Sequence, residues 1–303
     1  MKHHTIVTGA AVAPPSSATA VVFSYARPEQ PLLQRALIRA IETLSGRCRF
    51  ERLYHAWRQA PRDASETLFS AGARLLGVTP QVDAADLARI PPTGPLLVVA
   101  NHPFGIADGL AIGHLLASRR ADVKLMVHSL LCQLPEGRDL LLPVDFAADA
   151  AARRVSAETR RQAVGWLDQG HCLIVFPAGS ISTAAQPLAR HAVDAEWHPF
   201  VARLAQRPGV QTLPLFVHGQ NSRLFQTVSH FSYPLRLALI FSETRRRSGQ
   251  PLRIEVGATI PTGGFRAGKA GILAVLRAAC YGMAGADGPP ADQVFVWPKR
   301  IKF

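Results

Sequence analysis

The sequence predicts an α/β fold in which a mostly parallel or mixed central sheet is flanked by helices and preceded by a helical segment. Short runs rich in valine and leucine are typical of buried strands, and they cover residues 96–100, 123–127, 172–176 and 213–217. Helical patterns alternate with these runs at residues 108–118 and 156–170, the latter capped by Ser156 and preceded by an extended stretch at 140–144. Such alternation implies crossover helices, so polar residues that follow parallel strands should meet at one edge of the sheet.

Composition divides the chain into four parts. Residues 1–30 form a lead-in rich in Ala, Ser, Thr and Pro that is expected to be mobile or loosely docked. The predicted parts that follow are a helical segment at 31–90, an α/β domain at 91–285 and a basic aromatic tail at 286–303. The helical segment has amphipathic patterns at 31–44, 49–59 and 64–76. It either packs on the domain as ordinary helices or faces a membrane.

Bulk properties indicate a globular protein. Of the 303 residues, 48% are hydrophobic and 18% are charged, and the mean hydropathy is +0.10. No apolar run approaches the ~20 residues that a spanning helix needs. Pro14 and Pro15 interrupt any apolar N-terminal run, so no signal peptide is expected. The four cysteines form no C-x-x-C pair, which favours reduced thiols and a cytoplasmic location.

The net charge of +13 predicts an anionic partner. Nucleic acid, an acidic carrier protein and anionic lipid headgroups all satisfy this requirement. No basic stretch lies on a recognisable recognition helix, and the aromatic residues do not cluster for base stacking. Nucleic acid is therefore not expected as a partner.

The stretch from Leu97 to Ile112 carries the strongest chemical signal. Asn101, His102 and Gly105 follow a strand, and Asp108 opens the next helical pattern. A histidine at a strand end and a nearby acid can converge as a proton acceptor and its orienting partner. The structural alternative is that Asp108 is only the N-cap of a helix over 109–118.

Two more loops follow predicted strands at the same edge. The loop F176-P-A-G-S-I-S182 offers small hydroxyls on Ser180 and Ser182 and backbone N–H groups. In the second, L213-P-L-F-V-H-G-Q-N-S-R-L-F225, Arg223 could hold a phosphate or carboxylate, whereas His218 is expected to be a loop or core-edge residue.

These blocks, in this order and over about residues 91–261, resemble the phospholipid/glycerol acyltransferase family, also called the lysophospholipid acyltransferase superfamily. N101-H-P-F-G-I-A-D108 is similar to its Asn-His-(x)-Asp block, the 176–182 loop to its Phe-Pro-Glu-Gly-Thr-Arg-Ser block, and T212-L-P-L-F-V-H218 to its later Val-Pro strand. The H-P-F-G-x-x-D-G pattern resembles a bacterial branch, called hemolysin-like, that is associated with lyso-ornithine-lipid acylation.

The sequence departs from the family pattern at two places. His102 and Asp108 are one residue further apart than is usual in the broad family, and Gly105 can absorb the extra residue in a bulged loop. Ala178 and Ile181 stand where the family usually has glutamate and arginine. The polar grip on a glycerol phosphate is thus missing, which favours a different lyso-lipid acceptor.

The resemblance implies transfer of a fatty acyl group from an acyl thioester, on acyl carrier protein (acyl-ACP) or coenzyme A (acyl-CoA), to a lyso-lipid hydroxyl. His102 would be the general base, oriented by Asp108, with backbone N–H groups near Gly105 or Gly179 as oxyanion donors. The expected substrate-binding residues are Asn101, Phe104, Gly105, Pro177, Gly179, Ser180, Ser182, Asn221 and Arg223. Neither a cofactor, a metal nor an acyl-enzyme is expected.

The family context also gives the basic clusters a use. Arg153, Arg154, Arg160 or Arg161 would guide the acidic or polyphosphate donor. The tail F295-V-W-P-K-R-I-K-F303 suits an anionic lipid interface, unless it is a disordered tail with incidental aromatics. The expected location is peripheral, on the cytoplasmic face of the cell membrane.

Two other functions compete with this interpretation. A thioesterase or serine hydrolase would use Ser180 or Ser182 as nucleophile, although no G-x-S-x-G elbow is present. A non-catalytic membrane-binding homologue would explain the charge and the altered 176–182 loop.

Overall fold

A mixed β-sheet forms the centre of the protein in the computed structural model, which describes residues 23–26, 30–61, 63, 66–144, 150–265 and 268–298. The strands of this sheet lie in the order β1-β9-β8-β2-β5-β3-β4, and β10 also pairs with β8. Their bounds are Thr79–Gln81 (β1), Leu96–Ala100 (β2), Val123–His128 (β3), Leu141–Val144 (β4), Cys172–Val175 (β5), Gln211–Val217 (β8), Pro251–Val256 (β9) and Ile260–Pro261 (β10). A separate antiparallel pair consists of Thr183–Ala184 (β6) and Ala192–Val193 (β7).

The strands from β8 through β2, β5 and β3 to β4 are parallel, as the sequence predicts. The antiparallel pairings in the sheet are those of β9 and β10 with β8. Because β2 and β5 run side by side with Leu97 opposite Leu173, their carboxyl ends reach the same edge. The loops that begin at Asn101 and Phe176 therefore lie next to each other.

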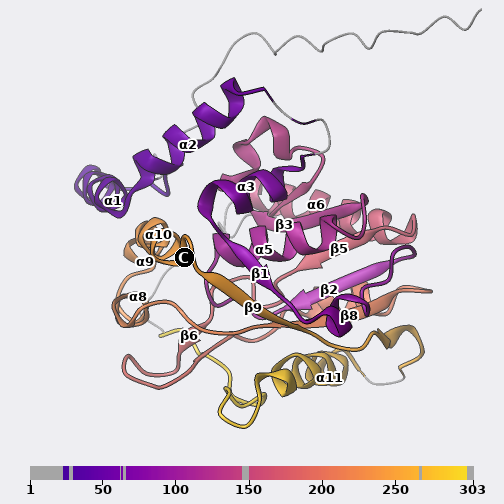
Figure 1. The fold of residues 1–303 in the computed structure, drawn as a ribbon. Coiled ribbons are helices and arrows are strands. Elements are labelled where there is room, and N and C mark those ends of the chain that lie inside the picture. Colours follow the sequence, from indigo (N-terminus) through magenta and orange to yellow (C-terminus); the bar gives the residue numbers. More distant parts are fainter. Residues whose placement is uncertain are drawn as a thin grey trace, which may run out of the picture.

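Helices cover both faces of this sheet (Figure 1). The helices are α1 (Leu32–Ser45), α2 (Arg47–Gln59), α3 (Leu68–Leu76), α4 (Ala84–Leu87), α5 (Ile106–Ala117), α6 (Ala150–Asp168), α7 (Pro199–Ala205), α8 (Arg223–Ser229), α9 (Tyr233–Ala238), α10 (Ile240–Arg247) and α11 (Lys269–Tyr281). Among the described residues, none of them is both long and apolar enough to cross a bilayer.

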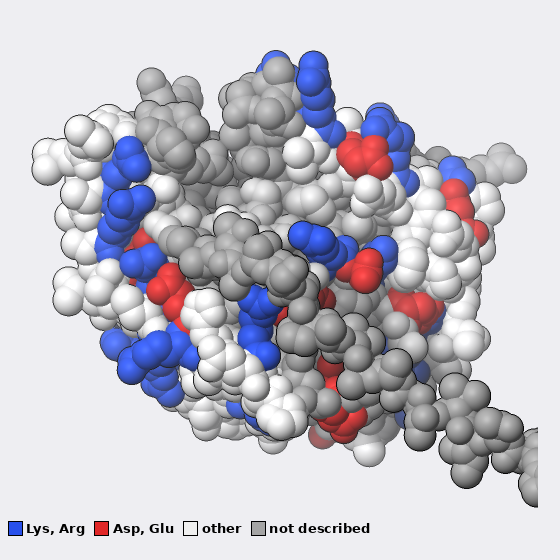
Figure 2. Space-filling view, turned by 90° about the horizontal axis from the view of Figure 1, so that it is seen from above, with Lys and Arg blue, Asp and Glu red and all other residues white. Residues whose placement is uncertain are grey.

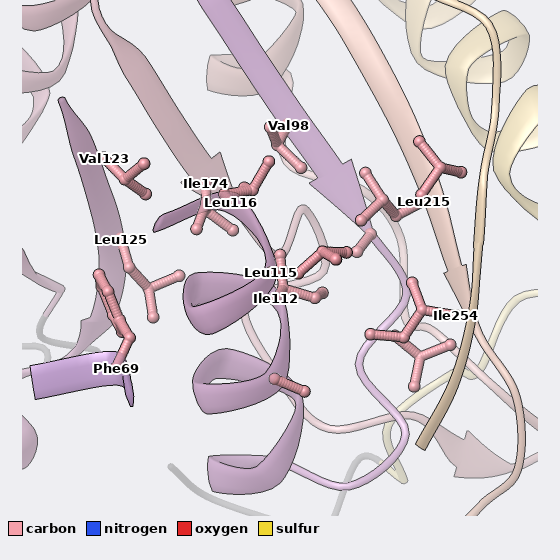
Figure 3. Close-up of a cluster of buried hydrophobic side chains, with 14 of the residues drawn as sticks. Phe69, Val98, Ile112, Leu115, Leu116, Val123, Leu125, Ile174, Leu215 and Ile254 are labelled. Atoms are coloured by element: carbon pink, nitrogen blue, oxygen red, sulfur yellow. The ribbon is translucent and has the colours of Figure 1, made fainter. Parts of the chain in front are cut away.

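One apolar core lies between the sheet and the helices α3 and α5. Val98 and Leu215 of the sheet face Ile112 and Leu116 of α5 across this core (Figure 3). Gly113 lets α3 approach α5, because a Cβ atom there would lie 2.4 Å from Cδ1 of the buried Phe69. This packing fixes α5, and with it the residues that precede it, against the end of β2.

The opposite face of the sheet packs on α6, α7 and α11. Leu97 and Val99 of β2 share a core with Leu167 of α6 and Leu276 of α11. Alternate residues of one strand thus enter two different cores, as the period of a buried strand requires.

The N-terminal helices begin and end close to their predicted limits, and α1 and α2 meet at Gly46, whose φ of 102° suits glycine. The third helix begins at Leu68, capped by the Thr67 side chain, whereas the prediction began it at Ala64, which lies outside the described residues. Strand β1 lies within the segment predicted to be helical and pairs with β9 at the edge of the sheet. A three-residue strand of mixed exposure has no visible period, which explains why it was missed.

Two predicted helix starts are wrong for a similar reason. Helix α6 already runs at Ala150, so Ser156 is an interior residue and not its N-cap. Helix α5 begins at Ile106, two residues before Asp108. In both cases a polar residue inside the helix was mistaken for its cap.

The ends of the described chain are docked on the molecule. Phe23 and Tyr25, from the lead-in predicted to be mobile or loosely docked, are buried against Tyr54 and Phe241. Phe295 of the tail is 2% exposed and pairs with Ala195. The aromatic half of the tail is therefore part of the fold and is not disordered, whereas residues 299–303, with most of the tail's cations, lie outside the described residues.

Candidate active site

Asn101 joins the two central strands at the edge where the site lies. Its side-chain amide donates to the carbonyl oxygen of Val217 at 2.9 Å, and its Oδ1 accepts the Val217 N–H at 2.7 Å. The amide donor and the amide acceptor of this side chain thus both link the end of β2 to the end of β8. Asn101 was predicted to bind substrate, but in the structure it fixes the backbone from which His102 projects.

His102 and Asp108 meet immediately beyond the end of β2. Nδ1 of the imidazole lies 3.0 Å from Oδ2 of the carboxylate, and the side chains are 17% and 0% exposed. The ring N–H is not aligned with this oxygen well enough for a hydrogen bond, so a rotation of the ring would complete it. The contact leaves Nε2 as the ring nitrogen that can face a substrate.

Asp108 is held by the backbone of the loop that precedes it. Its Oδ2 accepts the N–H groups of Phe104 at 2.8 Å and Gly105 at 2.9 Å. As the third residue of α5 it reaches back over the start of the helix and is not the predicted N-cap. The bonds that Asp108 makes at the start of the helix thus also hold its carboxylate beside His102.

Gly105 makes this turn possible. Its backbone has φ 78° and ψ −116°, which residues with a Cβ atom rarely adopt, and an added Cβ would lie 2.8 Å from Cδ1 of Ile181. The extra residue between His102 and Asp108 is accommodated here, as the sequence predicted.

The neighbouring loop from Phe176 to Ser182 contacts His102 through its first and last residues. The Phe176 ring stacks on the His102 ring with centroids 3.9 Å apart and an angle of 24° between the planes. The backbone N–H of Ser182 donates to the His102 carbonyl at 2.8 Å. Phe176 was not predicted as a site residue, although it directly follows β5 and His102 lies two residues after β2.

A second buried carboxylate, Asp194, lies under the same loops. Its Oδ1 accepts the Ser182 hydroxyl at 2.5 Å and the His102 backbone N–H at 3.3 Å, and its Oδ2 accepts the Trp197 indole N–H at 3.0 Å. Burial raises the pKa of Asp194, against the effect of these hydrogen bonds. The sequence offered only one signal for it, an acid within the apolar run 192–197.

The His102 imidazole opens into a cavity of about 430 Å³ that is lined mostly by apolar side chains. This volume is within the range of small-molecule sites, which is about 300–1,000 Å³. The cavity extends from α2 and α3, where Tyr54 and Trp57 line it, to α6 and α7, where Arg160 and His198 line it. A long apolar ligand can therefore lie beside His102.

Only part of the predicted substrate-binding set lines this cavity. The residues that do are Gly105, Pro177, Gly179 and Ser180, together with His102. The other predicted residues, which do not line it, are Asn101, Phe104, Ser182, Asn221 and Arg223.

Each of these outlying side chains has another place in the fold. Phe104 is buried, with the Arg247 guanidinium 4.6 Å from its ring centre. Asn221 is buried at the start of α8, and Arg223 is exposed and donates to the Leu188 carbonyl at 3.3 Å. The sequence placed them correctly near the sheet edge but could not give their direction.

The backbone N–H groups of Gly105 and Gly179 themselves already have partners. The N–H of Gly105 donates to Asp108, and that of Gly179 donates to the Phe176 carbonyl at 3.0 Å. Ser180 is different: its buried Oγ has no hydrogen-bond partner among the described residues. Because Ser180 also lines the cavity, its hydroxyl is available to a ligand.

Basic side chains gather at the α6–α7 end of the cavity. The backbone N–H of His198 donates to the Pro177 carbonyl at 2.9 Å, and the Arg160 guanidinium lies 5.7 Å from the centre of the Phe200 ring. Burial, with the charges of Arg160 and Arg203, lowers the pKa of His198.

Other candidate groups do not form a site. His218 contacts Glu255, with Nε2 3.3 Å from Oε1, as befits the loop or core-edge role predicted for it. In the part of the chain that the structure describes, no three His, Cys, Asp or Glu side chains are grouped to hold a metal ion.

Known proteins are similar to this sequence over half of the chain or more. A lyso-glycine lipid O-acyltransferase from Phocaeicola vulgatus is 24% identical over 191 residues, which are 60% of this chain and 64% of that protein. One from Bacteroides thetaiotaomicron is 27% identical over 153 residues, 50% of this chain and 53% of that protein. Each match thus spans less than two thirds of the relative.

A solved structure and a family model add to these relatives. The crystal structure of the 1-acyl-sn-glycerophosphate acyltransferase PlsC from Thermotoga maritima aligns over 82% of this chain and 78% of that one, with 16% identity and a TM-score of 0.45. The model of the family described as Acyltransferase matches residues 32–259, from the start of α1 to the residue before β10. The chain therefore belongs to the acyltransferase family.

Proposed function

We propose that the protein is an O-acyltransferase that moves a fatty acyl group from an acyl thioester to the hydroxyl of a lyso-lipid. The observation that carries this proposal is the His102–Asp108 pair, with 3.0 Å between Nδ1 and Oδ2, opening into an apolar cavity of about 430 Å³. The pair supplies a base, and the cavity supplies room for an alkyl chain.

In the proposed reaction Nε2 of His102 takes the proton of the acceptor hydroxyl as its oxygen attacks the thioester carbonyl. Asp108 fixes the ring tautomer and stabilises the imidazolium. The tetrahedral intermediate collapses, the carbon–sulfur bond breaks, and the thiolate takes the proton back from His102. An ester and a free thiol are the products.

Ser180 is the proposed donor to the developing oxyanion. Its hydroxyl lines the cavity with His102 and has no partner among the described residues. The hydroxyl would act beside backbone N–H groups near Gly105 or Gly179, other than those of the two glycines themselves, which donate to Asp108 and Phe176.

The acceptor is proposed to be a lyso-lipid with an amino-acid headgroup. Two relatives are named lyso-glycine lipid O-acyltransferases. In addition, Ile181 is 7% exposed and belongs to an apolar cluster, so it offers no polar grip on a glycerol phosphate.

The thioester donor is proposed to approach the α6–α7 end of the cavity. Arg160 and His198 line this end and Arg203 lies near them, which suits the phosphates of coenzyme A or of an acidic acyl carrier protein. Arg153, Arg154 and Arg161 lie on the same helix α6 as Arg160.

An anionic membrane surface is the proposed source of the acceptor, on the cytoplasmic side. Helix α1 exposes Leu33, Leu37 and Leu44 by 83%, 49% and 80%, while Arg35 and Arg39 flank them in sequence. Exposed leucines beside arginines are typical of a helix that lies in a lipid interface. Figure 2 shows several groups of Lys and Arg, with fewer Asp and Glu, on the face that it presents.

The experiment is to incubate purified protein with labelled acyl-ACP or acyl-CoA and a panel of lyso-lipids, and to identify the products by mass. The expected product is the acylated lyso-lipid, formed by the wild type and, about ten- to a hundredfold more slowly, by Ser180→Ala. Free fatty acid as the main product, with a label trapped on Ser180, would show a hydrolase. No chemistry with any acceptor, together with vesicle binding, would favour a non-catalytic membrane protein.

A further inference from the structure

Arg236 is a fully buried cation in the wall of the cavity. It belongs to α9, its side chain is among the largest fully buried ones, and the residue is 1% exposed. The guanidinium carbon lies 4.8 Å from the centre of the Phe225 ring and 4.9 Å from that of the Trp297 ring. Both rings make cation–π contacts with it.

The hydrogen bonds of Arg236 hold it against the loop that follows β5. Nη1 donates to the Thr183 hydroxyl at 2.5 Å, and Nη2 donates to the Ile181 carbonyl. Ile181 is the residue after Ser180, so the cation is attached to the segment that lines the cavity beside His102.

No carboxylate among the described residues lies within ion-pair distance of Arg236. Of the two other buried arginines, Arg120 is paired with Asp122 at 2.6 Å, and Arg277 donates to four backbone carbonyls. Among the described residues, Arg236 has as partners one hydroxyl, one carbonyl and two ring faces, and burial lowers its pKa to about 9. A buried positive charge without a counter-ion is unfavourable, and an anionic ligand would relieve it.

We propose that Arg236 binds the anionic headgroup, a carboxylate or a phosphate, of the lyso-lipid acceptor and so selects acceptors that carry one. This inference rests on the function proposed above. A planar guanidinium held by stacking presents its remaining N–H groups in a fixed fork, which suits either anion.

The position of α9 favours the acceptor over the thioester donor. Helix α9 packs on α1, which carries exposed leucines, whereas the cations assigned to the donor lie on α6 and at α7. Tyr233 of the same helix also lines the cavity. A lipid that enters from the α1 side would meet Arg236 with its polar end near Ser180.

The test compares two acceptors that differ only in charge, a lyso-lipid with a free headgroup carboxylate and its methyl ester. For the wild type, kcat/KM should be about tenfold or more higher for the carboxylate. Arg236→Met should bring this ratio close to one, and Arg236→Lys should retain part of the preference. Arg246→Met, which removes an exposed cation from α10, is the matched control and should keep the wild-type ratio.

Three results would overturn the assignment. A parallel loss of activity with both acceptors in folded Arg236→Lys would show a structural cation only. An unchanged kcat/KM ratio between the two acceptors in the variants would show that Arg236 does not bind the headgroup. A raised KM for the thioester with an unchanged acceptor ratio would assign the bound anion to the donor.

A binding measurement without thioester separates this inference from the proposed reaction. The carboxylate lyso-lipid should raise the Tm of the wild type more than its methyl ester does, and this difference should disappear in Arg236→Lys or Arg236→Met, whichever folds. If the wild type acylates nothing but shows the difference, the proposed function fails and the anion site stands. Equal shifts for both lipids would refute the anion site itself. A parallel lyso-lipid with a phosphate headgroup, tested in the same way, tells which of the two anions Arg236 prefers.

Discussion

Gly105→Ala tests whether stability and activity require the glycine conformation of the turn between His102 and Asp108. At φ 78° and ψ −116°, an alanine costs about 1–3 kcal/mol in backbone strain. Its Cβ would lie 2.8 Å from Cδ1 of Ile181, and such overpacking adds about 1 kcal/mol where the neighbour is the flexible end of a side chain. We expect the free energy of unfolding to fall by about 2–4 kcal/mol.

Gly105→Ala should also lower the rate of acyl transfer, and by a larger factor than its effect on stability alone would produce. A shift of the turn moves the N–H groups of Phe104 and Gly105 away from Asp108 and turns the carboxylate from His102, so acyl transfer should fall by about a hundredfold. Gly94→Ala is the control: φ is 87°, but no atom lies within 4 Å of an added Cβ, so only backbone strain acts. Urea unfolding and acyl transfer should be measured for both variants. A Gly105→Ala protein that is as stable and as active as Gly94→Ala would refute the reasoning.

Asn101→Ala removes both hydrogen bonds to Val217 and leaves the buried N–H and C=O of Val217 without this partner, so the free energy of unfolding in urea should fall by about 2–4 kcal/mol. A fall of less than about 0.5 kcal/mol would contradict a stabilising role for these two bonds. Because burial raises the pKa of Asp194, the folded protein binds this proton more tightly than the unfolded chain does, and wild-type stability relative to Asp194→Asn should fall as the pH rises from about 4 through the folded pKa. Urea titrations across pH check this, and a constant difference would contradict it. Leu37→Glu on α1 should weaken sedimentation with anionic vesicles by about tenfold, while Val275→Glu on α11, on the opposite side of the sheet (Figure 1), should not; equal effects would remove α1 from the lipid surface.

The sequence predicts the part of the site that depends on strand ends. Strand β2 has the predicted bounds, β5 ends one residue short of them, and their parallel pairing brings His102 and Pro177 to one edge. This succeeded because a buried parallel strand is a short apolar run and the loop after it is marked by Pro and Gly.

The sequence does not predict contacts that are made between distant segments. Asp194 and Arg236 come to the site from a loop and a short helix without a period, and the site residues that they contact, Ser182 and Thr183, are more than ten residues away in the chain. The direction of loop side chains could not be predicted for the same reason. Ser180 and Ser182 lie two residues apart, yet the first lines the cavity and the second donates to Asp194.

The predicted starts of α5 and α6 show a further limit of prediction from the sequence. Both Asp108 and Ser156 are good cap residues, yet α5 and α6 extend beyond them toward the N-terminus. In α5 the added Ala107 is buried, and a local preference of about 1 kcal/mol is easily outweighed by such packing. In α6 residues 153–155 are exposed, so packing does not explain its earlier start.

The most direct measurement is acyl transfer by His102→Ala from a labelled thioester to the lyso-lipid that the wild type acylates. The variant should unfold at a urea concentration close to that of the wild type, since the side chain is part-exposed, and should form the ester at least about a hundredfold more slowly. A folded His102→Ala protein that acylates the lipid at nearly the wild-type rate would contradict the proposal that this imidazole activates the hydroxyl.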